Sequence, residues 1–209
     1  MRAIWLSVFA VLLLIPLAAL AVPTGLNIMP TADILATGQE RVEYESNGSG
    51  KFYVPQGDLL YGTQTGFQGF EGGIDNATSK TSIYNLKWRL VKENVLLPSL
   101  AVGMQNVMMG QEPQSYAVVT KSIGPNGMLR ASVGLMHITG ETLTMIGAQG
   151  SMGPLVVKAD TASGNILSRS AVSTGYTLGK GFTVTGILYH FDNAPNEKTV
   201  LLSYTSNIF

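Results

Sequence analysis

The sequence predicts an all-β fold, a closed antiparallel transmembrane β-barrel of about 12 strands. Three observations predict it: an export leader opens the chain, no later apolar run is long enough to cross lipid as a helix, and short segments alternate apolar and polar residues. Inside lipid every backbone N–H and C=O group needs a partner within the protein, which only helices and closed sheets provide. Since helices are missing from the pattern, we expect the strands to close on themselves.

The leader has the parts of a signal peptide. Arg2 supplies a positive first region, residues 4–15 form an apolar core, and Pro16 ends this core ahead of Ala19 and Ala21, which give the small-x-small pattern of a cleavage site. We expect residues 1–21 to be removed by cleavage after Ala21. The alternative is an uncleaved anchor helix, for which the apolar run is at the short end of what crosses about 30 Å of hydrocarbon. No cysteine follows the site, so a lipid-anchored lipoprotein is excluded.

The composition fits a protein with few charges and an apolar exterior. Charged residues make up 12% of the chain, whereas about 25% is usual in soluble domains. The formal net charge of +0 gives no electrostatic reason to expect nucleic acid as a partner. Because the chain has no cysteine, disulfides cannot stabilise it, and backbone pairing and packing must do so.

Short segments bounded by Gly, Pro, Asn or Asp are the candidate strands. In the segment 81–91, Leu86 and Trp88 share one face while Asn85 and Lys87 share the other. A side-chain period of two is typical of a strand with one polar and one apolar face. The candidates are residues 39–47, 57–65, 69–76, 81–91, 98–108, 114–122, 128–138, 142–150, 153–162, 169–178, 181–190 and 198–207.

The faces of most candidates can be assigned from this alternation. In 128–138, Val133 and Leu135 oppose Arg130, so the arginine is expected to face the interior. The segments 142–150 and 181–190 are apolar on both faces, and their orientation stays open.

The connections alternate in length, which predicts the orientation in the membrane. Outer-membrane barrels have short periplasmic turns and longer outward loops, so we expect both chain ends on the periplasmic side. Residues 22–38 are then an extended periplasmic lead-in, which plugs the barrel mouth or lies along the inner wall, and residues 39–209 form the barrel. The tight connections follow even-numbered candidates (66–69, 124–127, 150–153, 179–181), and those after odd-numbered candidates are generally longer (48–56, 109–113, 163–168, 191–197).

Aromatic residues favour a barrel over a soluble exported β-sandwich, which also alternates but normally carries more Lys and Glu on its wet face. Most fall on apolar faces, several near strand ends, where interfacial girdles occur. The terminal Phe209 resembles the signal by which barrel-assembly machinery recognises outer-membrane barrels, and an incidental aromatic is the alternative. We expect outer-membrane lipid and this machinery to be partners. The aromatic residues in question are Tyr44, Tyr61, Tyr84, Trp88, Tyr116, Tyr176 and Tyr204.

The lead-in carries a family resemblance. PTGLNIMPTADILATGQ at 23–39 resembles the opening of the YjbH-like outer-membrane proteins, and NLKWRL at 85–90 and PSLAVGMQNV at 98–107 fit the same resemblance. The resemblance implies an outer-membrane barrel associated with exopolysaccharide production. The chain is much shorter than a typical YjbH-like protein, so it is expected to be a short, single-barrel relative.

Residues for catalysis or metal binding are scarce. His137 and His190 are the only histidines, and neither has a serine two positions away, as an outer-membrane phospholipase site would need. The chain has no cysteine, no histidine pair at ligand spacing and no regular carboxylate spacing. We therefore expect no enzyme activity, no cofactor and no metal.

The expected inward face of the barrel carries charges of both signs. Four basic residues, Lys87, Arg89, Lys121 and Arg130, are expected to form a patch that contacts an acidic or polar solute. Acids on the first strands are the alternative partners of this patch, in which case ion pairs close the lumen. The full set of candidate lumen residues is Arg41, Glu43, Glu45, Lys87, Arg89, Lys121, Arg130, Lys158 and Asp160, with Asp58, Glu71 and Asp75 on the same face.

The sequence leaves three functional hypotheses. The first is a porin-like narrow channel or envelope component for polysaccharide or small polar solutes in the outer membrane of a diderm bacterium. The second is a structural or interaction barrel with a closed lumen, whose loops at 48–56 and 163–168 meet a partner. The third is an exported soluble β-sandwich.

Overall fold

The structure is a computed structural model and describes residues 25–47, 56–64, 69–76, 82–107, 112–124, 127–165, 167–192 and 194–207. These residues contain twelve strands, each antiparallel to its neighbours, so the predicted all-β antiparallel sheet is confirmed. No helix within the described ranges is long and apolar enough to span a membrane. The strands are β1 (Gln39–Asn47), β2 (Gln56–Gln64), β3 (Gly69–Asn76), β4 (Ser82–Val91), β5 (Ser99–Val107), β6 (Gln114–Ile123), β7 (Leu129–Ile138), β8 (Glu141–Met152), β9 (Leu155–Ser163), β10 (Ser168–Gly179), β11 (Phe182–Phe191) and β12 (Ala194–Asn207).

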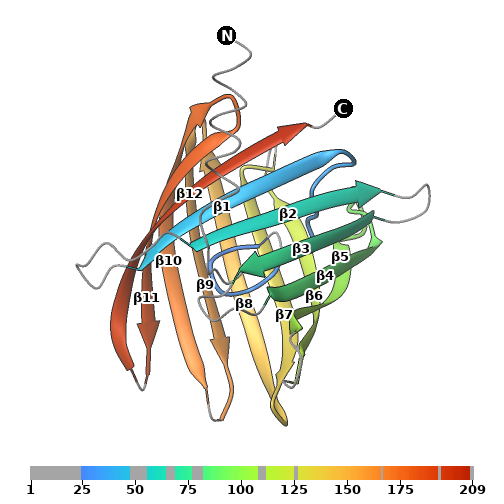
Figure 1. The fold of residues 1–209 in the computed structure, drawn as a ribbon. Coiled ribbons are helices and arrows are strands. Elements are labelled where there is room, and N and C mark those ends of the chain that lie inside the picture. Colours follow the sequence, from blue (N-terminus) through green and yellow to red (C-terminus); the bar gives the residue numbers. More distant parts are fainter. Residues whose placement is uncertain are drawn as a thin grey trace.

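The described strands form a ring (Figure 1). Each strand pairs with its neighbours in the chain, and β1 also pairs with β12, from Gln39 opposite Asn207 to Asn47 opposite Thr199. This last pairing matters because an open sheet would leave two edges of N–H and C=O groups without partners. We call the end of the ring where β1 begins and β12 ends the proximal end, and the opposite end the distal end.

The distal connections depart from the predicted pattern of long loops. The β12 strand begins at Ala194, so only residues 192–193 separate it from β11, and the loop predicted at 191–197 is wrong. Strands β7 and β8 are joined by Thr139 and Gly140, whose φ angles of 45° and 78° are both positive, as in two-residue hairpin turns. Strand pairing therefore continues further towards the distal end than turn-forming residues predict.

The proximal end carries the longest connection that the structure describes in full, residues 92–98 between β4 and β5. The β8–β9 and β10–β11 connections at the same end are residues 153–154 and 180–181. Most of the predicted loop at 48–56 lies outside the described residues.

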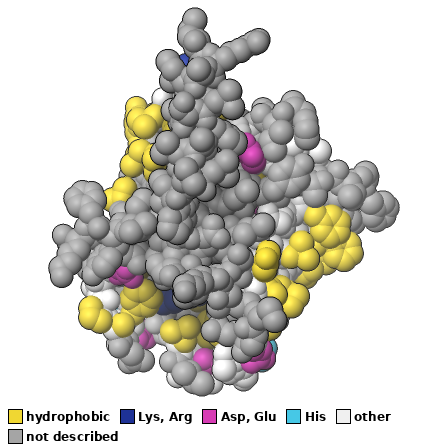
Figure 2. Space-filling model, in the orientation of Figure 1, with side chains coloured by type: hydrophobic (Ala, Val, Ile, Leu, Met, Phe, Trp, Pro, Cys, Tyr) yellow, Lys and Arg dark blue, Asp and Glu magenta, His cyan; other side chains and the backbone are white. Residues whose placement is uncertain are grey.

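Side chains alternate between an exposed outer face and the interior. On β4, Leu86 and Trp88 are exposed while Asn85 and Lys87 are buried, as the alternation predicts. Figure 2 shows hydrophobic side chains gathered at the right of the view, on the side where β4 and β5 lie. Elsewhere the exposed hydrophobic side chains include Val133, Leu135, Ile146, Val157, Val172, Tyr176, Leu178, Val184, Leu188, Val200 and Leu202.

The structure orients the two strands that the sequence leaves open. Strand β8 turns Leu143 and Met145 inward, where neither has exposed surface, and β11 turns Thr185 and Ile187 inward. Each strand has apolar residues on both faces because part of the barrel interior is itself apolar.

Two pairs of aromatic side chains lie on the outer face near the proximal end, and Tyr84 is exposed near the distal end. Phe70 stacks on Trp88 with ring centroids 5.4 Å apart, and Phe182 contacts Tyr204 at 4.4 Å. Tyr116 is an exception, since it points into the barrel and is 5% exposed. The prediction that Tyr116 lies on the apolar outer face is wrong.

Candidate functional site

Part of the lead-in, residues 25–35, lies inside the barrel. Met29 and Ala32 have no exposed surface, and Ile28 and Leu35 are 5% and 4% exposed. In Figure 1 this segment is the blue trace enclosed by the strands. The lead-in therefore occupies the lumen.

The first half of this segment is a turn held by one carboxylate. Leu26 N–H donates to the carbonyl of Met29 at 3.0 Å, which folds the chain back on itself. The N–H groups of Asn27, Ile28 and Met29 then point together and donate to the side chain of Asp160, with shortest distances of 3.2, 2.6 and 2.9 Å. The Asn27 side-chain amide adds a fourth donor at 2.7 Å. Successive N–H groups that converge in this way bind an anion well, and here the anion comes from β9.

The second half of the segment is held by a buried ion pair on the opposite wall. Lys87 Nζ lies 3.3 Å from Glu71 Oε1, and the two side chains are 0% and 1% exposed. Lys87 also donates to the carbonyl of Asp33 at 2.6 Å, while Glu71 Oε2 accepts the N–H of Leu35 at 2.8 Å. Each charge thus has the extra hydrogen bonds that a buried pair needs.

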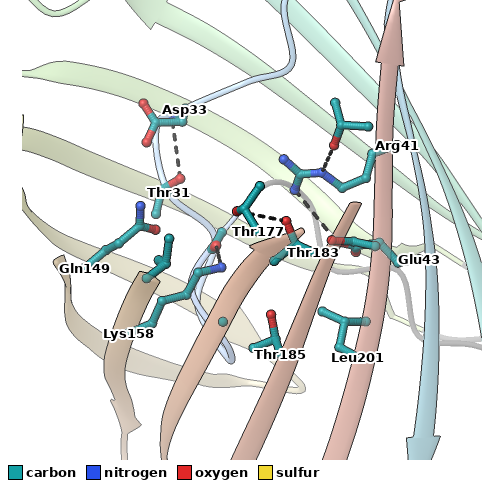
Figure 3. Close-up of a pocket in the computed structure, with 15 residues that line it drawn as sticks. Thr31, Asp33, Arg41, Glu43, Gln149, Lys158, Thr177, Thr183, Thr185 and Leu201 are labelled. Atoms are coloured by element: carbon teal, nitrogen blue, oxygen red, sulfur yellow. Dashed lines mark hydrogen bonds and ion pairs between the residues drawn. The ribbon is translucent and has the colours of Figure 1, made fainter. Parts of the chain in front are cut away.

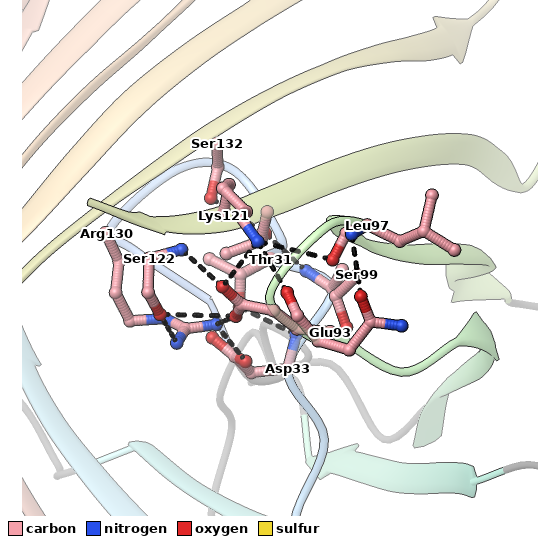
Figure 4. Close-up of polar contacts among 12 residues, drawn as sticks. Thr31, Asp33, Glu93, Leu97, Ser99, Lys121, Ser122, Arg130 and Ser132 are labelled. Atoms are coloured by element: carbon pink, nitrogen blue, oxygen red, sulfur yellow. Dashed lines mark hydrogen bonds and ion pairs between the residues drawn. The ribbon is translucent and has the colours of Figure 1, made fainter. Parts of the chain in front are cut away.

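A third polar cluster lies at the proximal rim (Figure 4). Arg130 Nη2 is 2.7 Å from Asp33 Oδ1 and 3.2 Å from Glu93 Oε2, so it links the lead-in to the β4–β5 turn. Glu93 Oε1 accepts the N–H of Ser122 at 2.7 Å. Lys121 Nζ, at 3.7 Å from Glu93, completes the cluster.

The electrostatics of this rim keep Glu93 ionised. Partial burial raises the pKa of Glu93, but the hydrogen bonds from Ser122 and the charges of Arg130 and Lys121 outweigh burial and hold the pKa below its usual value. The rim is therefore held most strongly when Glu93 carries its charge.

Apolar packing fills one side of the lumen. Met29 and its neighbours in the lead-in form one apolar cluster with inward side chains that come mainly from β5–β8, with smaller contributions from β9–β11. At Gly147, a Cβ atom would collide with Leu26 and lie 3.0 Å from Met29 Sδ, so the wall has no side chain where the lead-in passes. The inward face is therefore partly apolar, although the sequence analysis identifies only its charged residues. The buried apolar set is Leu26, Ile28, Met29, Ala32, Ala101, Tyr116, Val118, Met136, Leu143, Met145, Ala162, Ala171 and Ile187.

The other side of the lumen is hollow and polar. A cavity of about 280 Å³ lies between the lead-in and the wall made by β1 and β9–β12, towards the proximal end (Figure 3). Arg41 Nη1 lies 3.8 Å from Glu43 Oε1 across its edge, and Lys158 Nζ donates to the carbonyl of Gly25 at 3.2 Å. Hydroxyl groups supply most of the remaining polar lining, from Thr31, Thr177, Thr183, Thr185, Ser203 and Thr205.

The structure places the candidate lumen residues in several separate parts of the barrel instead of one site. Arg41, Glu43 and Lys158 line the cavity, whereas Lys87 and Asp160 are committed to the lead-in. The other candidates are Arg89, which is opposite Gly69 in the β3–β4 ladder, Arg130 at the rim, and Glu45, Asp58 and Asp75, whose side chains lie outside the described residues.

Lys121 faces the outer side of the barrel. On β6 the buried residues are Tyr116, Val118 and Thr120, and Lys121 has the opposite parity, opposite Ala131 of β7. The prediction that it lines the lumen is wrong, and with it the prediction of one shared patch formed by Lys87, Arg89, Lys121 and Arg130.

The converging N–H groups of the lead-in are the functional feature that the sequence analysis missed. Backbone N–H groups are present at almost every residue, so their convergence cannot be predicted from residue types. In the sequence, Asp160 is therefore only one of several acids expected on the inward face. The one available signal was the turn-rich start GLNIMP at 25–30, which excludes a helix without indicating a carboxylate partner.

The histidines are far from these clusters. His137 and His190 lie at the distal end, on the outer face, where His137 Nε2 is 3.9 Å from Glu112 and His190 Nε2 is 3.8 Å from Asp192. Across the described ranges no three His, Asp or Glu side chains are grouped closely enough to hold a metal ion.

The fold resembles solved porin structures. A structure of KdgM porin in complex with disordered oligogalacturonate superposes with a TM-score of 0.62 at 9% identity and covers 79% of this chain and 98% of that chain. A second KdgM porin structure gives 0.59 at 9% identity with the same coverage. A structure from work on the in-meso crystallisation of membrane proteins gives 0.55 at 12% identity, over 80% and 83% of the two chains. No family model and no curated protein matches the sequence. At these identities the likeness shows the fold alone, which is that of a porin-type antiparallel β-sheet.

Proposed function

We propose that this chain is an outer-membrane β-barrel that admits small polar or polysaccharide-like solutes, and that residues 25–35 close its lumen at rest. The observation that carries the proposal is the polar cavity enclosed between the lead-in and the strands. The fold shared with KdgM porin and the exposed apolar outer face support a place in a membrane.

The cavity favours a polar solute with little net charge. Arg41 is beside Glu43, and the ammonium group of Lys158 is already bonded to the carbonyl of Gly25, so neither cation stands alone. Hydroxyl groups on β10–β12 can donate to and accept from the hydroxyls of a sugar or polyol. We propose this chemistry in place of an anion-selective basic patch, because the four residues expected to form the patch are dispersed.

The wider setting follows from the same proposal. The leader at 1–21 directs export and is removed after Ala21, the proximal end faces the periplasm, and the protein acts without catalysis. A role beside exopolysaccharide production, implied by the YjbH-like resemblance of residues 23–39, belongs to this proposal as well. Barrel-assembly machinery would insert the chain.

A second candidate function is a structural barrel with a permanently closed lumen. The tight fit of Met29 and Ala32, neither of which has exposed surface, favours it. Under this alternative the lead-in is part of the core, and the distal connections such as 164–167 contact a partner in the envelope.

Conductance through planar bilayers tests the proposal. Ala32 N–H donates to Thr120 Oγ1 at 2.9 Å, and the chain has no cysteine of its own, so Ala32→Cys with Thr120→Cys puts two thiols on contacting segments, and we expect their oxidation to lock the lead-in in place. We expect deletion of residues 25–35 to raise conductance strongly, and the reduced double-cysteine protein to open more often than the oxidised one. A deletion variant that migrates as a folded barrel but does not conduct would contradict the proposal that solutes pass through the lumen. Conductance by the deletion variant alone, with no difference between the oxidised and reduced proteins, would favour the structural barrel.

A further inference from the structure

We propose that the β4–β5 turn inserts three side chains, Val95, Leu96 and Leu97, into the lipid leaflet at the proximal end of the barrel. We call these three residues the apolar finger. The inference rests on the membrane-spanning orientation in the proposed function, and the experiment below distinguishes failure of the finger from failure of that orientation.

The three side chains of the apolar finger are more exposed than is favourable for apolar residues in water. Val95, Leu96 and Leu97 are 92%, 88% and 53% exposed, and they follow one another in a turn, where polar residues and glycine are usual. On the neighbouring strands the outer face continues with Ile123 and Leu129, paired with each other and 47% and 43% exposed. The finger is therefore continuous with the apolar exterior of the barrel, and lipid is the surrounding that covers both.

Backbone groups of the finger have hydrogen-bond partners within the protein. Asn94 Oδ1 accepts the N–H groups of Leu96 and Leu97 at 2.9 and 2.8 Å, and Asn94 N–H donates to the carbonyl of Leu97 at 3.0 Å. Such Asx turns are also common in water, but here they give the turn the internal partners that backbone groups in hydrocarbon require.

Lys121 satisfies the carbonyl groups of the same turn. Its Nζ lies 2.6 Å from the carbonyl oxygen of Asn94, 3.2 Å from that of Val95 and 3.4 Å from that of Leu97 (Figure 4). Because Lys121 leaves β6 on the outer face, its apolar stem runs along the exterior and its ammonium group remains at the rim, as lysines at membrane boundaries do. Glu93, anchored to Ser122 and Arg130, fixes the start of the turn.

Aromatic side chains place the finger at the level of the membrane boundary. Trp88, stacked on Phe70, lies on the outer face of β4 shortly before the turn. Trp and Tyr collect where hydrocarbon meets the headgroups. The finger begins a few residues beyond Trp88, so it lies close enough to the membrane boundary for its side chains to enter the leaflet.

Depth-dependent fluorescence quenching tests the finger. Trp88 is the one tryptophan after the predicted leader, so Trp88→Phe gives a background in which Leu96→Trp is the single reporter. Each folded protein is placed in phosphatidylcholine vesicles with bromine atoms near the top or near the middle of the acyl chains. We expect the Leu96→Trp reporter to lose emission mainly with the shallow bromines and to be protected from aqueous iodide. As the matched control, Val133→Trp on the outer face of β7 should respond mainly to the deep bromines.

Two results decide the inference. If the reporter at position 133 is quenched by brominated lipid and the one at position 96 is quenched by iodide alone, the finger does not enter the leaflet. If neither responds to brominated lipid, the spanning orientation itself fails. Within the Leu96→Trp protein, Lys121→Met should reduce quenching by shallow bromines, whereas Lys92→Met, which changes an exposed lysine of the same turn, should leave it unchanged. Equal effects of the two lysine changes would overturn the role of Lys121.

Discussion

The two sides of the lumen are built differently although one sheet encloses both. Against β5–β8 the lead-in is packed among apolar side chains, with Leu143 and Met145 fully buried. Against β1 and β9–β12 it leaves a polar cavity lined by Arg41, Glu43 and Lys158. The packed side resembles a soluble protein core and the hollow side resembles a pore wall. We infer that apolar packing on the first side, together with Asp160 and the Lys87–Glu71 pair, holds the lead-in, and that the cavity on the second side is where a solute would enter.

The largest expected effect comes from the buried ion pair that anchors the lead-in. Lys87→Met should lower the free energy of unfolding by about 3–5 kcal/mol, because it leaves the Glu71 carboxylate buried without its partner. Lys92→Met, which changes an exposed lysine of the β4–β5 turn, is the control, with an expected loss below about 1 kcal/mol. Urea unfolding in detergent measures both. Equal losses would contradict the role of the buried Lys87–Glu71 pair.

The next prediction compares one leucine from each side of the lumen. Leu143→Ala should cost about 2–5 kcal/mol, because it opens a cavity in a packed region. Leu201→Ala should cost less than about 2 kcal/mol, since Leu201 already borders a cavity and loses fewer contacts. Thermal unfolding followed by heat-modifiable migration on a gel ranks the two. The reverse order would mean that the packed and hollow sides have been exchanged.

A smaller effect is expected at the carboxylate that holds the turn of the lead-in. Asp160→Asn keeps the shape of the side chain but removes its charge, and hydrogen bonds to a charged group contribute about 1.5–3 kcal/mol. We expect faster hydrogen exchange at the amides of residues 27–29 while the strands keep their protection. Asp192→Asn, at an exposed distal position, is the control. Unchanged exchange at 27–29 would show that Asp160 does not hold the turn.

The smallest expected effect is a pH dependence at the proximal rim. Because the folded pKa of Glu93 is lowered, its contribution to stability is complete above the unfolded value of about 4.3 and is lost as the pH falls through the folded pKa. Wild type should therefore lose more stability than Glu93→Gln between neutral pH and pH values below that range. If the stabilities of the two proteins changed equally with pH, Glu93 would not be the source of the pH dependence.

Much of the sheet could be predicted from the sequence, because a period of two is a local property. Leu86 and Trp88 against Lys87, and Val133 against Arg130, have the predicted faces. The inward face of β6 could not be predicted, because Ala117 and Val119 on one face are as apolar as Tyr116 and Val118 on the other. The local pattern therefore does not indicate which face is turned inward. The expectation that charges line the lumen puts Lys121 inside the barrel, whereas its partners are carbonyl groups of the β4–β5 turn at the rim.

Other features depend on contacts between distant parts of the chain. The polar start of β12, with Pro195 and Asn196, reads as a loop, yet pairing with β11 makes it strand from Ala194. The hold of the lead-in on Asp160 joins residues more than a hundred positions apart through backbone N–H groups. No spacing in the sequence indicates a contact between backbone N–H groups and a distant carboxylate. For this reason the sequence predicts only that the lead-in plugs the barrel mouth or lies along the inner wall, without choosing between the two.

The central claim is that the lead-in packs tightly against one side of the lumen and leaves a polar cavity against the other, and cysteine labelling tests it most directly. The natural chain has no cysteine, so Met29→Cys and Ser203→Cys, made separately, each carry one thiol. With a charged maleimide applied to the folded barrel, we predict that the Ser203→Cys thiol, in the cavity wall, is labelled and that the Met29→Cys thiol is labelled only after denaturation. Equally fast labelling of both thiols in the folded protein would contradict the claim.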